Sequence, residues 1–254
     1  MTTSIITGSA SGIGAATRAR LEADGERVIG IDLARAEVDA DLSHADGRAH
    51  AVAAALALCD GRCDRLVLSA GLAESAPLPA VASVNYFGAV ALLDGLFPAL
   101  AEGKRAAAVV LSSNSARLAP LDDTPFVKAL LDGDEPGARR IADAERNTFL
   151  AYGGSKLALA IAIRRRAMEW GQAGVRLNAI APGPTETPLL DAVRSDPGRA
   201  EGLRRLPNPL GRHASPEEIA DIIVFLLGPQ AGYIHGAVLY ADAGIDAAVH
   251  PDRL

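Results

Sequence analysis

Tyr152 and Lys156 are the pair of residues with the clearest chemical use in this sequence. A free tyrosine is a poor base near neutral pH because its pKa is about 10. A nearby cation stabilises the phenolate and lowers that pKa. The two residues are four positions apart and would share one face of a helix. The pair therefore predicts proton transfer to and from an alcohol or carbonyl oxygen. The alternative is a half-buried aromatic beside a solvent-facing lysine.

A glycine-rich turn lies between a predicted strand, Ser4–Thr7, and a predicted helix, Ala15–Ala23. Such a turn lets the backbone approach a pyrophosphate closely, and the start of the helix attracts its negative charge. A tight turn with only a structural role is the alternative. We expect a dinucleotide to be bound by Gly8, Ser11, Gly12, Ile13 and Gly14.

Asp32 ends the second predicted strand, Arg27–Leu33. A carboxylate at this position can accept hydrogen bonds from the adenosine ribose and repel a 2′-phosphate, which predicts NAD rather than NADP. Arg35 lies close in sequence and offers an alternative phosphate partner, and Asp32 could also be a solvated strand end.

Short apolar runs alternate with helical patterns through the chain, which indicates right-handed crossovers and a parallel sheet. Further strands are predicted at Arg65–Ser69, Ala107–Ser112, Val175–Ile180 and Ala237–Tyr240, and further helices at Gly47–Leu58, Val84–Leu100, Tyr152–Trp170 and Pro216–Leu227. We expect an α/β fold: a single Rossmann-type domain over residues 1–254, with a doubly wound parallel sheet of about seven strands and helices on both faces.

The composition excludes several classes of protein. The formal net charge of −6 argues against a nucleic-acid binder. Cys59 and Cys63 are the only cysteines, they complete no metal set, and their small number fits a reducing compartment. The first residues lack the pattern of a signal peptide. The apolar run Ile222–Leu227 is too short to span a bilayer. We therefore expect a cytoplasmic protein without a metal, nucleic-acid or membrane partner.

Three further motifs occur in the order expected of one enzyme family: Ser69-Ala70-Gly71, Tyr152-Gly153-Gly154-Ser155-Lys156 and Ala181-Pro182-Gly183-Pro184-Thr185. Together with the glycine turn they resemble the short-chain dehydrogenase/reductase family over the whole chain. The resemblance implies NAD as the cofactor. It also implies cofactor contacts at Asp32, Asp41, Leu42, Ser69, Ala70, Gly71, Tyr152, Lys156, Pro182, Gly183, Thr185 and Thr187.

The resemblance also implies a catalytic set. Tyr152 would be the general base in oxidation and the general acid in reduction. Ser113, with Ser112 as the alternate, would hold the substrate oxygen, although a run of four polar residues here could simply cap a strand. Lys156 would bind the nicotinamide ribose. Asn85 would hold a water that links Lys156 to solvent, or would only be a structural residue of the helix.

Further stretches are similar to a bacterial hydroxysteroid-oxidising branch of the family: Gly12–Arg18, Gly30–Asp32, Ser83–Gly88, Ala181–Gly183, Thr185–Leu190 and Gly244–Ala247. They imply a secondary alcohol and ketone on a small apolar substrate, with a 3α-hydroxysteroid as one candidate. An aryl or terpene alcohol is the alternative. A non-catalytic, cofactor-binding regulator is the alternative of another class, but it would have no need to keep Ser113, Tyr152 and Lys156.

The sequence departs from the family pattern in two places. Ser69 stands where the family usually has Asn. An insertion over about 118–148 separates Ser113 from Tyr152. It would block the pairing of long helices that forms tetramers, which favours a homodimer over a homotetramer. Its helical pattern predicts a folded element, with a disordered surface insertion as the alternative.

A segment over about 185–212 is rich in Pro, Gly and Arg and is expected to form the substrate lid. Few charged groups are expected in the cleft. The lid would present an apolar face of Leu189, Leu190, Val193, Leu203 and Leu206, although the same residues could pack against the core.

Overall fold

The structure is a computed structural model that describes residues 1–253. Seven parallel strands form one sheet, which confirms the predicted parallel sheet of about seven strands, and their order is β3-β2-β1-β4-β5-β6-β7. The strands are β1 (Thr3–Thr7), β2 (Arg27–Asp32), β3 (Val38–Asp39), β4 (Arg65–Leu68), β5 (Ala107–Leu111), β6 (Arg176–Pro182) and β7 (Val238–Ala241). The two-residue β3 was not identified from the sequence because it is too short to show a periodic pattern.

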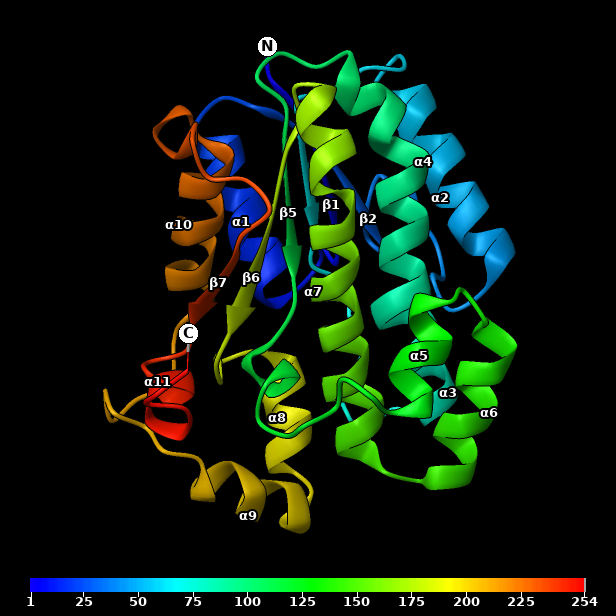
Figure 1. Ribbon diagram of the computed structural model, residues 1–254. Helices are drawn as coiled ribbons and strands as arrows, with labels where there is room; N and C mark the ends of the chain where they lie inside the picture. Colours follow the sequence, from blue (N-terminus) through cyan, green and yellow to red (C-terminus); the bar gives the residue numbers. More distant parts are fainter. Residues whose placement is uncertain (254) are drawn as a thin grey trace.

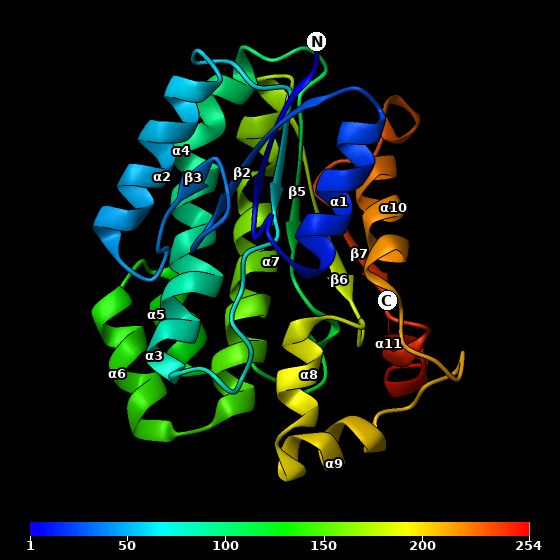
Figure 2. The same cartoon turned by 180° about the vertical axis from the view of Figure 1, so that it is seen from behind.

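Helices α1 (Gly12–Ala23) and α10 (Pro216–Leu227) lie side by side on one face of the sheet (Figures 1 and 2). Their contact buries Leu21, Ile219 and Ile223 against the apolar side chains of the strands. The start of α10 was predicted correctly, and Ser215 and Glu218 form a capping box there.

Helices α2 (Ala45–Leu58), α4 (Ala89–Ala101) and α7 (Thr148–Gln172) cover the other face. Cys59 and Cys63 are buried within this larger core, and both are free cysteines. Burial raises the pKa of the Cys63 thiol to about 12, so this thiol is inert packing material.

The predicted helix Val84–Leu100 begins earlier and is not uniform. It comprises α3 (Leu78–Ala82), a π-helical turn over Ser83–Gly88 and α4. The stretch Leu78–Ala101 is long and apolar enough to cross a membrane, but 61% of its apolar window is buried inside the protein. This burial is what is expected of a core helix.

The inserted segment folds into α5 (Pro125–Leu131) and α6 (Glu135–Glu145), so the disordered alternative is wrong. Phe126, Val127 and Leu130 are buried, and α5 packs against α7. The second turn of α7 carries two glycines, of which Gly154 makes room for α5 and Gly153 for the backbone at Ser115. A Cβ atom on Gly154 would lie 2.9 Å from Phe126 Cδ1, and one on Gly153 would lie 3.0 Å from Ser115 O.

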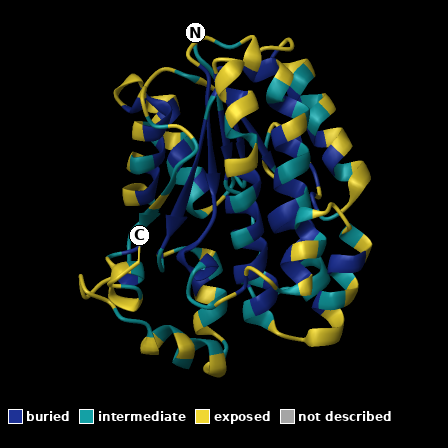
Figure 3. Ribbon diagram, in the orientation of Figure 1, coloured by how far each residue is buried: buried dark blue, intermediate teal, exposed yellow. Residues whose placement is uncertain are grey.

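Three short helices lie beyond the carboxyl ends of the strands: α8 (Pro188–Arg194), α9 (Pro197–Arg205) and α11 (Ile245–Val249). The expected lid is therefore largely helical. No residue of α9 is buried, and Figure 3 shows this region as mainly exposed and intermediate. Single-turn 3₁₀ helices at Asn114–Ala116 and Pro229–Ala231 complete the fold.

Candidate active site

A cavity of about 1110 Å³ lies at the carboxyl ends of the strands. It begins beside β1 and β2, passes β4 and β5, and ends under α8 and α9. Strand β1 lies between β2 and β4, so the chain reverses its winding direction at this point, and open α/β sheets bind ligands there. The cavity brings together Ser113 and all the expected cofactor residues except Gly14.

The glycine turn is built by close backbone contacts. Gly8 and Gly12 have φ angles of 69° and 52°, which favour glycine. A Cβ on Gly8 would lie 2.8 Å from the backbone nitrogen of Ala70, and a Cβ on Gly14 would lie 2.0 Å from Gly8 O. Gly14 is therefore a packing residue that lets the turn close, whereas Gly8 and Gly12 line the cavity.

Asp32 is anchored at one end of the cavity. Its Oδ2 accepts a hydrogen bond from Ala10 N at 2.9 Å, and its Oδ1 accepts one from Leu33 N at 2.7 Å. The carboxylate is thus held beside the glycine turn, where a ribose would lie. Arg35, the alternative phosphate partner, is not among the described residues that line the cavity.

Tyr152 and Lys156 lie in the middle of the cavity, in the first turns of α7. Burial raises the pKa of Tyr152 to about 12, although the neighbouring Ser113 hydroxyl lowers it. Burial lowers the pKa of Lys156 to about 8. Its Nζ donates to Leu111 O at 2.8 Å and lies 5.9 Å from the centroid of the tyrosine ring. In the protein alone the pKa of Tyr152 thus lies above its ordinary value, because burial is the largest cause and the Lys156 ammonium is directed to Leu111 O.

The two candidate serines have different surroundings. The Ser112 hydroxyl donates a hydrogen bond to Lys156 O at 2.8 Å, so its hydrogen is used by the backbone of α7 and is not available to a substrate. Ser113 Oγ accepts hydrogen bonds from Ser115 N at 3.2 Å and from Ser115 Oγ at 2.9 Å. Because both bonds are accepted, the hydroxyl hydrogen of Ser113 is left to donate into the cavity. This difference favours Ser113 over Ser112.

Asn85 lies in the π-helical turn and does not line the cavity. Its Oδ1 accepts from Leu72 N at 2.7 Å, and its Nδ2 donates to Leu72 O at 3.0 Å. A Cβ on Gly71 would lie 3.3 Å from Asn85 Oδ1 and 3.5 Å from Lys156 Nζ. The amide thus fixes the loop after β4 close to Lys156, and a water relay through Asn85 stays a prediction.

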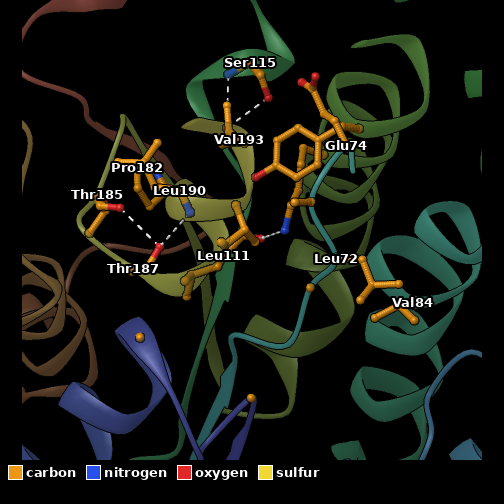
Figure 4. A pocket seen from close by; sticks show the side chains of 18 of the residues that line it. Leu72, Glu74, Val84, Leu111, Ser115, Pro182, Thr185, Thr187, Leu190 and Val193 are labelled. Carbon is orange, nitrogen blue, oxygen red and sulfur yellow. Dashed lines mark hydrogen bonds between the residues drawn. The ribbon is translucent and has the colours of Figure 1, made fainter. Parts of the chain in front are cut away.

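The expectation of few charged groups in the cleft is wrong. Glu74, Asp196 and Arg199 all line the cavity. Figure 4 shows Glu74, Ser115 and Val193 among the residues that line the cavity, with Leu72 and Val84 on the other side of the view from Thr185 and Thr187. Burial raises the pKa of Glu74, whereas the Arg199 charge and the Thr148 hydroxyl lower it. The sequence analysis did not identify Glu74 as a site residue. Its position three residues after Gly71 nevertheless places it in the same loop as the predicted cofactor residues Ser69 to Gly71.

A family model described as enoyl-(acyl carrier protein) reductase matches residues 138–246. The chain is 50% identical to the 3-alpha-hydroxysteroid dehydrogenase/carbonyl reductase of Comamonas testosteroni, and the alignment covers 98% of each protein. The chain belongs to the short-chain dehydrogenase/reductase family. It is accordingly an oxidoreductase.

Two further relatives extend this finding. The crystal structure of the 3-alpha-hydroxysteroid dehydrogenase from Pseudomonas sp. B-0831, complexed with NADH, has a TM-score of 0.98 and 48% sequence identity, and the match covers both chains fully. The cis-4-hydroxycyclohexanecarboxylate dehydrogenase of Sinomonas cyclohexanicum is 32% identical over 96% of each chain. Both names describe dehydrogenases, in keeping with the sequence prediction.

Proposed function

We propose that this short-chain dehydrogenase/reductase interconverts the hydroxyl and keto groups of a hydroxysteroid with NAD(H). The observation that carries the proposal is the single cavity that joins Asp32, the Tyr152–Lys156 pair and the lid. The two hydroxysteroid dehydrogenases among its relatives match nearly the whole chain, which supports the same substrate class.

The residues at the Asp32 end fit NAD. Gly8 and Gly12 offer the close backbone approach that a pyrophosphate needs, and the Asp32 carboxylate suits free ribose hydroxyls. Thr185 and Thr187 lie on the opposite wall from Leu72. NAD supplies the hydride acceptor for oxidation and NADH supplies the donor for reduction.

The Tyr152 phenol is the proton donor and acceptor in this proposal. Its high pKa keeps the phenol protonated near neutral pH, which is the state needed to protonate a carbonyl oxygen during reduction. Ser113 donates a hydrogen bond to the same oxygen and fixes its position. Lys156 adds positive charge below its pKa of about 8 and thereby favours loss of the tyrosine proton during oxidation.

The lid end of the cavity supports an apolar substrate. Its lining includes Leu189, Leu190, Val193, Leu203 and Leu206. Apolar walls with a few placed polar groups are typical of pockets for apolar ligands. An aryl or terpene alcohol would suit the same walls, and we expect such compounds to be poorer substrates because they cover less of this surface.

Turnover of a substrate panel tests the proposal. Absorbance at 340 nm would follow NADH formation with androsterone, its 3β epimer, a monoterpene alcohol and 1-phenylethanol, each with NAD or NADP. We expect the 3α epimer with NAD to give the highest kcat/KM. Turnover of the small alcohols alone would overturn the steroid assignment. No turnover despite NADH binding would favour a cofactor-binding regulator.

We also propose a homodimer. Phe225, Tyr233 and Leu239 are exposed, and they come from α10, the segment after it and the edge strand β7. The inserted helix α5 packs on α7, and α6 packs on α5, so the insertion opposes a tetramer built on α7. Light scattering should give twice the chain mass, and Phe225→Glu should lower it, whereas Met168→Glu, an exposed change on α7, should not. The cytoplasmic location stays a prediction.

A further inference from the structure

Arg48 is a buried cation in the first turns of α2, with only 7% of its surface exposed. Its Nε donates to Leu42 O at 2.8 Å, and its Nη2 donates to Ser43 O at 3.2 Å. Its two terminal nitrogens also meet both carboxylate oxygens of Glu135, at 2.7 and 2.6 Å. The guanidinium thus joins two backbone carbonyls to one carboxylate.

The two carbonyls belong to the loop that closes the Asp32 end of the cavity. Leu42 and Ser43 line this end together with Asp41. The loop is attached on its other side by Ala40 N, which donates to Asp32 O at 2.7 Å. Leu42 is buried against Gly88, where a Cβ would lie 3.2 Å from Leu42 Cβ. Arg48 therefore supplies the side-chain hydrogen bonds that hold this loop on the α2 side.

Glu135 is the first residue of α6 and comes from the inserted segment. Burial raises the pKa of Glu135, but the hydrogen bond and charge of Arg48 hold the pKa below its ordinary value. A buried guanidinium needs such a partner, because removing one member of a buried pair leaves an uncompensated charge. A second contact holds α6 independently, since Arg139 donates to the buried Ser83 hydroxyl at 2.7 Å.

We propose that Glu135 is a positioning residue for the cofactor, and that the inserted helices serve to fix the loop at residues 40–43 against the adenosine half of NAD(H). This inference rests on the proposed function. Without the carboxylate, the Arg48 guanidinium turns toward water and releases the carbonyls of Leu42 and Ser43. The loop then loses its fixed position, while the Tyr152 end of the cavity keeps its own supports.

The test compares NADH with reduced nicotinamide mononucleotide, which lacks the adenosine half. Glu135→Gln keeps the shape of the side chain and removes its charge. We expect the Kd of NADH, measured by fluorescence titration, to rise about fivefold to tenfold, as for residues that act through a neighbour. We expect kcat with saturating NADH, and kcat/KM with the mononucleotide, to stay within about twofold.

Glu26→Gln is the matched control. Glu26 is a similarly buried partner of Arg65, and its side chain accepts a hydrogen bond from Ser4 Oγ. Glu26 directly precedes β2 and Arg65 begins β4, so this pair lies at the amino ends of the strands, on the opposite edge of the sheet from the cavity. We expect a comparable loss of thermal stability in the two variants, but an unchanged Kd of NADH in Glu26→Gln.

Three results would overturn the inference. These are an unchanged Kd of NADH in Glu135→Gln, an equal loss with the mononucleotide, or an equal rise in the Glu26→Gln control. If Glu135→Gln fails to fold, Arg48→Met provides the same test, because it removes the bonds to Leu42 and Ser43 and leaves its charge on Glu135, the more exposed member of the pair. Failure of the wild-type protein to bind NADH would instead contradict the proposed function.

Discussion

The two ends of the cavity are held in different ways. At the Asp32 end, buried backbone contacts and a buried ion pair fix the glycine turn and the loop at residues 40–43. At the lid end, α9 buries no residue, and the lid carries exposed pairs such as Arg194 with Glu186 and Arg204 with Glu201. Exposed pairs contribute little to stability, typically about 0–1 kcal/mol each.

This difference assigns separate tasks to the two ends. A cofactor of fixed shape gains affinity from a rigid, preformed site. A lid held by weak surface contacts can move to admit and release a substrate. Changes at the rigid end should therefore alter cofactor binding, and changes at the lid should alter substrate binding by smaller factors.

The largest effect is expected where the two ends meet. Tyr152→Phe removes the proton donor and keeps the ring, so kcat should fall about 10²–10⁴-fold. The Kd of NADH should stay within about twofold. Steady-state rates and fluorescence titration measure the two quantities. Turnover at the wild-type rate would refute the role of Tyr152, and lost NADH binding would show that the two ends are not separable.

At the rigid end, Asp32→Ala should change the choice of cofactor. The variant loses hydrogen bonds to the ribose and the repulsion of a 2′-phosphate. The ratio of kcat/KM for NAD over NADP should fall about tenfold, which corresponds to about 1.4 kcal/mol. Substrate KM at saturating NAD should not change. An unaltered ratio would show that another group selects the cofactor.

Between the two ends, Glu74→Gln should change the pH profile of oxidation. The Glu74 carboxylate raises the pKa of Tyr152, so removing its charge should lower that pKa. Because oxidation needs the deprotonated phenol, the rise of kcat/KM with pH should move to lower pH. Reduction should begin to fall at lower pH for the same reason. Glu102→Gln, a change on the exposed end of α4, serves as the control and should leave both profiles unchanged.

At the lid, Arg194→Gln should have the smallest effect. The Arg194 guanidinium holds the pKa of Glu186 down to about 2, but both side chains are exposed. We expect a change in steroid KM of about twofold or less, and an unchanged melting temperature, because exposed pairs are weak. A tenfold change in KM would mean that the pair fixes the lid and that the contrast between the two ends is smaller than proposed.

The rigid end was also the more predictable from the sequence. Gly8, Gly12 and Asp32 follow strands whose apolar runs are easy to identify, and parallel strands bring their carboxyl ends together. The ends of most strands and helices were predicted within a few residues for the same reason. The position of Tyr152 and Lys156 followed from their spacing on one helix.

The features of the site that the sequence did not predict depend on contacts between segments that are distant in sequence. Glu74 and Arg199 are more than a hundred residues apart, so their meeting in the cavity could not be predicted from local patterns. The raised pKa of Tyr152 in the protein alone could not be predicted, because spacing gives the neighbour but not the depth of burial. Gly14 does not line the cavity, and a cofactor contact there stays a prediction, because a close backbone contact and a ligand contact favour the same residue type.

The glycines after Tyr152 bear on how the inserted helices could be lost during evolution. Gly153 and Gly154 make room for Ser115 O and the Phe126 ring, and each glycine weakens a helix by about 1 kcal/mol relative to alanine. Deletion of α5 would leave Gly154 bare in the turn that carries the phenol and the ammonium, because its contacts are with Phe126 and Val127 of α5. A descendant without the segment would therefore first need a larger residue at position 154, and while the segment is present that residue would clash with Phe126. The glycine of α7 and the inserted helix α5 therefore preserve each other during evolution, because neither can be changed first without loss.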